Sequence, residues 1–288
     1  MTEDVDLAGA ESPADKKERL RRGSSFGAVA AAYAEHRPDY AEAAVRWALE
    51  PAAARQRLSA DPGRPPPQVP PLRVVDLGAG TGKLTATLVH LGAAVTAVEP
   101  DPRMLAALRR ELPAVRSLPG GAEDIPLPDG CADAVLAGQA MHWFDLGRAM
   151  PEMARVLVPA GVVAGLWNID DDRIGWVAEL ARIRQRGGDA TLLGWRGGVG
   201  RSRREQLATA GGGLFGAVRS REFRHGQPRT AESLLATIAT HSDPLAMDEP
   251  ERTVLFAQIR DFLHARPEIS VGEFVLPMIT VVLRAIRK

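Results

Sequence analysis

The chain has 288 residues, a formal net charge of zero and a single cysteine, Cys131. That length allows one elaborated domain or two small ones. The balanced charge gives no electrostatic footprint for a nucleic acid. One cysteine forms neither an internal disulfide nor a cysteine-rich zinc site, so we expect no metal and a reducing, cytoplasmic setting. The apolar runs are too short for a membrane span, and the polar, acidic start is unlike a signal peptide.

Composition divides the chain into five regions. Residues 1–22 are polar and charged, which predicts a disordered tail. Residues 23–60 are predicted to be helical, with an alanine-rich helix after Pro38. The proline-rich residues 61–71 predict a stiff linker. An α/β core follows over residues 72–170, and a helix-rich region with the last strands of the sheet completes the chain over 171–288.

Strand and helix patterns alternate through the core, which predicts a mostly parallel sheet with helices on both faces. The expected strands are Arg73–Leu77, Ala94–Glu99, Val115–Leu118, Ala132–Gly138 and Gly161–Asn168. The expected helices are Lys83–Leu91, Pro102–Leu112 and Leu146–Val156.

The first strand runs into a loop with glycines at positions 78, 80 and 82, and the second strand ends on Glu99. A strand, a glycine-rich loop, a helix and then an acid predict a nucleotide-type ligand at the end of a parallel sheet, with the acid on a ribose. Dinucleotide binding needs its third glycine at position 83, where this chain has Lys83. The spacing therefore disfavours a nicotinamide oxidoreductase.

The motif Asp76-Leu-Gly-Ala-Gly-Thr-Gly82 resembles motif I of the class I S-adenosylmethionine (SAM)-dependent methyltransferases. Three more segments resemble the trans-aconitate methyltransferase-like, or type 11, group: Phe26 to Tyr40, Gln139-Ala-Met-His-Trp-Phe-Asp145, and Trp167-Asn168. The likeness covers about residues 24–288 and is weaker beyond Asp170. It implies a Rossmann-like sheet with an antiparallel last strand, an N-terminal helical lid over the SAM pocket and a C-terminal helical cap.

The resemblance also implies the SAM contacts. The loop backbone would wrap the methionine part, Glu99 would bind the ribose, and Glu123 or Asp124 would accept from the adenine amine. Met104 would pack on the adenine or be plain core, and Arg37 would bind the methionine carboxylate or form a surface ion pair. The full implied set is Tyr33, Arg37, Asp76, Gly78, Ala79, Gly80, Glu99, Pro100, Met104, Ala122, Glu123, Asp124 and Gln139.

Methyl transfer from a sulfonium requires alignment and exclusion of water, and it needs a base only if the nucleophile keeps a proton. The candidate catalytic residues are His142, His241 and Tyr33. Each histidine could instead be a structural hydrogen-bonding residue or a solvated one.

Beyond residue 170 we expect helices over 230–240 and 248–265. Two strands, Arg221–His225 and Phe274–Ile286, are expected to pair antiparallel at the sheet edge, where Pro277 is tolerated. The arginines of the Gly-rich stretches are expected to face solvent; they are Arg173, Arg196, Arg201, Arg203 and Arg204.

The acceptor is predicted to be a small, aromatic or indole-type specialised metabolite, methylated on carbon, nitrogen or oxygen to leave S-adenosylhomocysteine (SAH). The expected substrate contacts are Phe26, Tyr40, His142, Trp143, Trp167, Asn168 and His241. One alternative is carboxyl O-methylation of a small polyacid, and another is a non-catalytic SAM-binding regulatory protein. An RNA methyltransferase is disfavoured by the neutral charge. We expect a monomer or homodimer without membrane or nucleic-acid partners.

Overall fold

A computed structural model describes residues 37–59, 70–186, 200–241, 244–245, 247–266, 269 and 272–288. The predictions for the tail of residues 1–22, for Phe26, Tyr33 and Arg196, and for most of the linker lie outside these residues.

A seven-stranded sheet organises the chain in the order β3-β2-β1-β4-β5-β7-β6. The first five strands run parallel, and β7 is antiparallel to both β5 and β6. This confirms the predicted Rossmann-like, mixed sheet. The strands are β1 Arg73–Leu77, β2 Ala94–Glu99, β3 Arg116–Pro119, β4 Ala132–Gly138, β5 Leu157–Asp170, β6 Arg219–Arg229 and β7 Phe274–Ile286.

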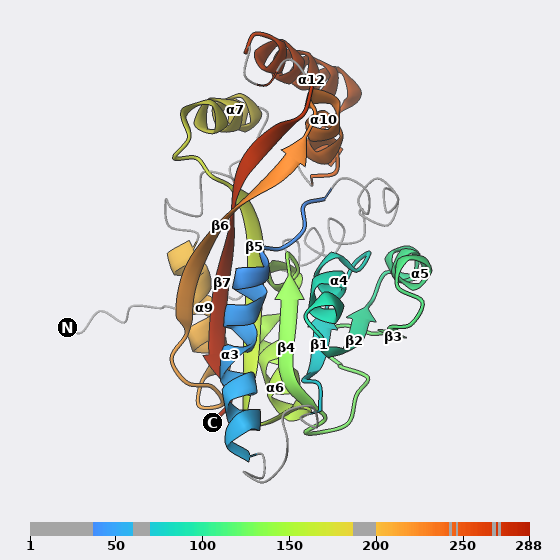
Figure 1. Ribbon diagram of the computed structural model, residues 1–288, viewed down its shortest axis with the longest axis vertical. Helices are drawn as coiled ribbons and strands as arrows, with labels where there is room; N and C mark the ends of the chain where they lie inside the picture. The colour runs from blue at the N-terminus through green and yellow to red at the C-terminus, as the bar shows by residue number, and fades with distance from the viewer. Residues whose placement is uncertain are drawn as a thin grey trace, which may run out of the picture.

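Helices cover both faces of the lower part of the sheet (Figure 1). The helices α3 and α4 pack on one face and α6 and α9 on the other, as their separate apolar clusters show. The helices are α3 Glu42–Ser59, α4 Lys83–His90, α5 Pro102–Glu111, α6 Leu146–Val156, α7 Gly175–Arg186, α9 Gly200–Gly211, α10 Ala231–Ala239 and α12 Glu249–His264, with a 3-10 turn, η3, at Met141–Trp143.

The helix α3 is a layer of the core. Ala44, Val45, Ala48 and Ala52 are fully buried on the face that packs against the sheet. Figure 1 shows α3 running alongside the lower part of the sheet, with its first turn at about the level of the tip of β4. The segment just before α3 reaches the carboxyl end of the sheet, since Asp39 pairs with Lys83 at the start of α4 at 3.3 Å. The predicted lid over the ligand pocket stays a prediction, and its part before Arg37 lies outside the described part of the chain.

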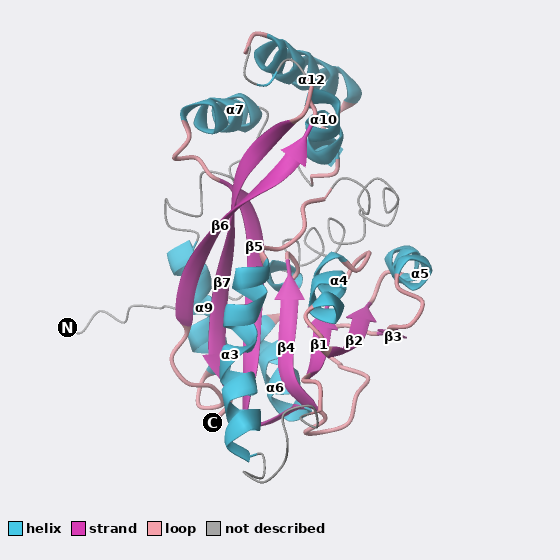
Figure 2. Cartoon of the chain, in the orientation of Figure 1, coloured by secondary structure: helices cyan, strands magenta, loops and turns pink. Residues whose placement is uncertain are grey.

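The long strands β5, β6 and β7 extend beyond the parallel part and lead into α7, α10 and α12 (Figure 2). These helices share a separate apolar cluster that includes Leu180, Leu234, Ile259 and Leu263. We call this part, α7, α10, α12 and the strand ends that they cover, the upper lobe. It corresponds to the predicted C-terminal cap.

Two strands of this extension, β5 and β6, exceed their predicted lengths, whereas β7 has the predicted ends. The prediction ended β6 at His225 because Gly226 and Pro228 follow, but the ladder with β7 continues to Arg229. An edge strand tolerates proline because one side of it needs no ladder hydrogen bonds. The residue opposite Gly226 is Pro277, which lies beyond the end of the β5 ladder at Met278. Pro277 thus occupies the edge-like position expected of it.

Candidate functional site

The glycine loop between β1 and α4 lies at the carboxyl end of the parallel strands. Gly78 and Gly80 have φ of +68° and +57°, a region that other residues rarely adopt. A Cβ on Gly78 would stand 2.7 Å from the Cβ of Ala140, so the glycine lets this loop touch the loop after β4. A Cβ on Gly80 would meet no atom of the described residues within 4 Å. Among the residues that the structure describes, the backbone at Gly80 therefore faces open space.

Glu99 fastens this loop to the end of β2. The N–H of Gly80 donates to its Oε2 at 2.8 Å, and the N–H of Asp101 donates to its Oε1 at 2.9 Å. Burial raises the pKa of the Glu99 carboxyl, which the two N–H donors oppose. Because each carboxylate oxygen has two acceptor positions, Glu99 retains capacity to accept from a diol.

Only one of the two oxygens of the buried Asp76 carboxyl accepts a hydrogen bond from the described residues. The Oγ1–H of Thr85 donates to its Oδ2 at 2.5 Å, whereas Oδ1 has no hydrogen-bond partner among the described residues. The hydroxyl of Thr81, in the glycine loop, is also buried without a partner. Burial, opposed by hydrogen bonds from Thr85 and supported by the charge of Glu99, raises the pKa of Asp76 to about 7. Unsatisfied buried polar atoms at a loop of this kind are what a bound ligand would complete.

The segment after β3 contributes a second wall. The Oε1 of Glu123 accepts from the N–H of Asp145 at 2.7 Å, which ties this segment to the start of α6. Ala122 and Met104 are buried, whereas the side chains of Asp124 and Pro100 are exposed. Of the two predicted adenine acceptors, Glu123 is thus engaged by the protein and Asp124 is not.

The loop after β4 is held in an unusual backbone conformation. Gln139 has φ of +54°, its N–H donates to the carbonyl of Leu166 at 2.8 Å, and its Nε2 donates to the carbonyl of Asn168 at 2.8 Å. Such conformations cluster at functional sites. The turn η3 then places the rings of His142 and Trp143 4.6 Å apart.

His142 is a neutral imidazole that accepts a hydrogen bond. The indole Nε1–H of Trp167, which can only donate, lies 3.3 Å from Nδ1, so the ring proton is on Nε2. Burial, together with the charges of Arg203 and Arg37, lowers the pKa of His142 to about 3.

His241 has a similar environment in the upper lobe. Its Nδ1 lies 2.6 Å from a guanidinium nitrogen of Arg184, which also pairs with Asp170 at 3.0 Å. Burial lowers the pKa of His241 well below its ordinary value, and Arg37 and Arg184 add to this. Arg37 itself donates to the side-chain oxygen and the carbonyl of Thr240 at 3.1 and 3.0 Å. Its charge thus acts on both predicted histidines.

Sequence reasoning missed Asp170, Arg184 and Thr240. No motif marks them, because their partners come from distant parts of the chain.

Tyr40 and Asn168 lie in the interior. Asn168 donates to the carbonyl of Asp39 at 3.0 Å and accepts from the hydroxyl of Thr280 at 2.6 Å. Tyr40 is 8% exposed, and its hydroxyl leaves no room for a Cβ on Gly138. Both residues hold the chain before α3 against the sheet, and their predicted contact with substrate stays a prediction.

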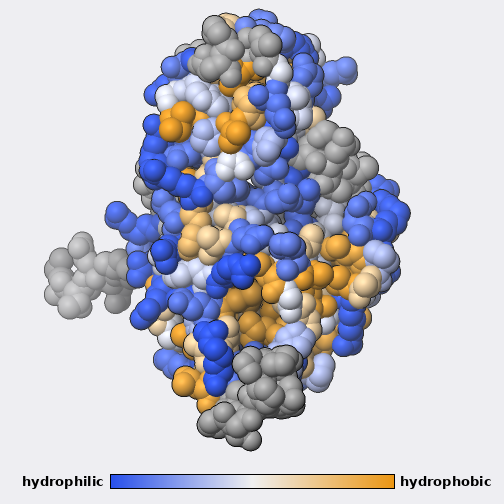
Figure 3. Space-filling model, in the orientation of Figure 1, coloured by the Kyte–Doolittle hydropathy of each residue, from blue (hydrophilic) through white to orange (hydrophobic). Residues whose placement is uncertain are grey.

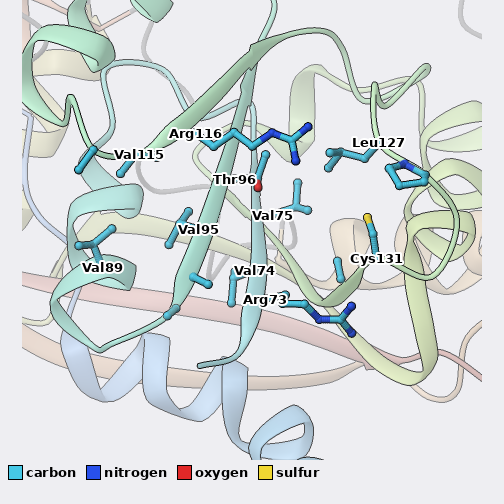
Figure 4. A pocket seen from close by; sticks show the side chains of 15 residues that line it. Arg73, Val74, Val75, Val89, Val95, Thr96, Val115, Arg116, Leu127 and Cys131 are labelled. Atoms are coloured by element: carbon cyan, nitrogen blue, oxygen red, sulfur yellow. The ribbon is translucent and has the colours of Figure 1, made fainter. Parts of the chain in front are cut away.

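A separate cavity of about 550 Å³ lies at the other end of the sheet (Figure 4). It is lined mainly by the amino ends of β1 and β2, with Arg116 and Cys131. On the molecular face seen in Figure 3, apolar residues gather in the lower half. None of the predicted site residues lines this cavity, so it is not the ligand site at the glycine loop.

Comparison with known proteins decides the family. The methyltransferase domain family matches residues 75–165. An uncharacterized methyltransferase of Mycobacterium tuberculosis is 38% identical over 262 residues, which cover 91% of this chain and 95% of the relative. The chain belongs to the class I SAM-dependent methyltransferases.

Other methyltransferases extend the comparison. An uncharacterized methyltransferase-like protein of Schizosaccharomyces pombe is 31% identical over 200 residues, covering 68% of this chain and 75% of the relative. Among solved structures, a protein described as a type II methyltransferase from Anaeromyxobacter dehalogenans has a TM-score of 0.57 at 23% identity. It covers 87% of this chain and 97% of its own. This likeness shows a shared methyltransferase fold.

Two further observations concern only the part of the chain that the structure describes. None of its helices is long and apolar enough to cross a membrane. No group of three or more histidine, cysteine, aspartate or glutamate residues there is arranged to hold a metal ion.

Proposed function

We propose that this methyltransferase binds SAM at the glycine loop and transfers its methyl group to a small molecule, with SAH as the second product. The observation that carries this proposal is the incomplete polar environment of the loop. Asp76 Oδ1 and Thr81 Oγ1 are buried without partners, and the backbone at Gly80 faces open space. A ligand with amine and hydroxyl donors suits these groups.

Different residues around the loop would contact different parts of SAM. Asp76 and the backbone of Gly78, Ala79 and Gly80 would hold its methionine part, and Glu99 would accept from its ribose. Met104, Ala122 and Asp124 would surround the adenine, with Glu123 positioning the segment, while Pro100, Gln139, Arg37 and Tyr33 complete the predicted set. When bound, SAM supplies an electrophilic methyl group on a sulfonium.

The histidines are better suited to positioning than to removing a proton. Each Nδ1 already faces a donor, from Trp167 for His142 and from Arg184 for His241. An imidazole whose pKa is about 3 is also a weak base at neutral pH. The Nε2–H of His142 is left to donate to the acceptor molecule. The enzyme would then work mainly by aligning the reactants and excluding water, with Tyr33 kept as a candidate base.

Aromatic rings at the loop after β4 support an aromatic acceptor of specialised metabolism. His142 and Trp143 are half-buried there, and Trp167 lies behind His142. Carboxyl O-methylation of a small acid is the second candidate, favoured by the positive charge of Arg37 and Arg203 beside the same imidazole. A regulatory protein that binds SAM without turnover is the third.

Incubation with methyl-labelled SAM and a panel of indoles, phenols and small carboxylic acids, followed by mass spectrometry, tests these candidates. Label on an aromatic ring, nitrogen or hydroxyl supports the first, and a labelled methyl ester supports the second. SAM binding without label on any acceptor, including those of a host extract, would contradict the enzymatic proposal.

A further inference from the structure

Arg203, in the first turn of α9, lies beside the predicted acceptor site. Its guanidinium carbon is 5.7 Å from the centroid of the Trp167 ring, a cation–π geometry. The same indole donates to His142. One turn further along α9, Leu207 is buried in the main apolar cluster, which fixes this face of the helix. The sequence-based expectation that Arg203 faces solvent is therefore wrong.

The half-buried guanidinium of Arg203 lacks the partners that such a group normally has. Its Nε is buried and makes no hydrogen bond, and no carboxylate among the described residues forms an ion pair with it. By contrast, Arg184 pairs with Asp170, and Arg284 pairs with Glu50. Withdrawing a cation from water without a counter-charge is unfavourable, so a binding role is a natural reason for it.

The charge of a second arginine, Arg37, also acts on the imidazole of His142. Arg37 is held in place by Thr240. Like charges in a poorly solvated region repel each other, and an anionic group bound at Arg203 would offset that repulsion. The stacking on Trp167 orients Arg203 in advance, which leaves its planar fork available to a carboxylate or phosphate group.

We propose that Arg203 binds an anionic carboxylate or phosphate group of the methyl acceptor, close to His142. This inference rests on the proposed function and narrows its substrate class to anionic small molecules. In it, Trp167 is a positioning residue, because it acts through Arg203 and His142.

Calorimetric titration of the full chain, saturated with SAH, tests the proposal with three matched pairs of probes. These are indole-3-acetate with indole-3-acetamide, benzoate with benzamide, and phenyl phosphate with phenol. We expect at least one anion to bind about tenfold or more tightly than its neutral partner. Arg203→Gln should remove this preference, and Arg203→Lys should restore part of it. The exposed neighbour Arg204 supplies the control, since Arg204→Gln should keep the preference.

The proposal is overturned if the wild type shows no preference for any anion, or if Arg203→Gln retains the preference of the wild type. Carboxylate and phosphate probes distinguish the two anion types. Titration of each variant with SAH alone keeps the two proposals separate: Arg203→Gln should bind SAH as the wild type does. Absence of SAH binding in the wild type would instead contradict the proposed function.

Discussion

The ionised carboxylate of Asp76 is unfavourable for folding but is expected to favour SAM binding. Burial raises the pKa of this carboxyl from 3.8 to about 7. An acid with a raised pKa disfavours the folded state once it must ionise. Its cost is therefore absent below about pH 4 and grows as the pH rises through 7. When the pKa of a group in the folded chain differs by one from its value in the unfolded chain, stability changes by about 1.4 kcal/mol.

The substitution Asp76→Asn should separate these two effects. It keeps an acceptor for Thr85 but cannot ionise, so the ligand-free variant should melt at a higher temperature than the wild type at pH 8. The difference should vanish toward pH 4. The variant should also bind SAM more weakly. Thermal denaturation across this pH range, with exposed Glu111→Gln as control, checks the prediction; equal melting of variant and wild type at pH 8 would contradict it.

His142 should remain neutral throughout the physiological range. Its depressed pKa means that the unfolded chain binds a proton more readily than the folded one. The contribution of neutral His142 to the stability of the folded chain is therefore complete above about pH 6.5. It is lost as the pH falls toward 3. We expect the imidazole resonances of His142 to show no titration between pH 5 and 8, identified by comparison with His142→Gln. A midpoint near 6.5 would contradict the described environment.

At this scale, the sequence signals a candidate site residue where that residue acts through its own backbone or lies on an adjacent strand. Gly78, Gly80 and Glu99 are marked by the order of strand, loop and acid. Arg203 gave no such signal, since an arginine in a Gly-rich stretch resembles a solvated one. Its contact with Trp167 depends on a helix and a strand that are far apart in the sequence.

At the scale of elements, the glycine loop offers a matched pair of substitutions. Gly80 and Gly92 both have positive φ, and a Cβ on either meets nothing within 4 Å. Alanine at either position carries a similar backbone strain of about 1–2 kcal/mol. The two sites differ in place, because Gly92 follows α4 and lies away from the site.

We expect Gly80→Ala and Gly92→Ala to lose similar stability, whereas only Gly80→Ala loses SAM affinity. The reason is that the new methyl group fills the space beside the loop backbone. Chemical denaturation and SAM titration of both variants provide the comparison. A similar SAM affinity in the two variants would show that no ligand approaches Gly80.

Element boundaries were predictable where local signals agree. The segments β1, β2, β4 and α6 were predicted with the observed ends, because turn residues border each apolar run. The full length of β6 was not, since Gly226 and Pro228 interrupt its pattern. Its pairing with β7 overrides that local preference.

At the scale of the whole molecule, the upper lobe has its own apolar cluster yet contributes to the site. Arg37 reaches Thr240 across 203 positions of sequence, and Arg184 reaches His241 across 57. The alternating strands and helices predicted the parallel core, but no sequence period encodes contacts of this length. They arise from how β5 and β7 carry the upper lobe over the site (Figure 1).

Substitutions in the core of the upper lobe and in the lower core should therefore affect turnover and SAM affinity differently. Leu263 in the upper lobe and Leu88 in the lower core are both fully buried, so alanine at either should cost about 2–5 kcal/mol. Below the melting temperature, Leu263→Ala should lower turnover more than SAM affinity, because Thr240 and His241 belong to its lobe. Leu88→Ala should leave both nearly unchanged. Equal turnover in the two variants would mean that the upper lobe does not shape the site.

The most direct test of the central claim is calorimetric titration of the full chain with SAM and with SAH. The account predicts one site per chain with a dissociation constant on the order of micromolar. Glu99→Gln should weaken binding by about 1–3 kcal/mol, because the buried carboxylate of Glu99 holds the loop and is proposed to accept from the ribose. Absence of binding, or the same affinity in Glu99→Gln as in the wild type, would contradict the assignment of the glycine loop as the cofactor site.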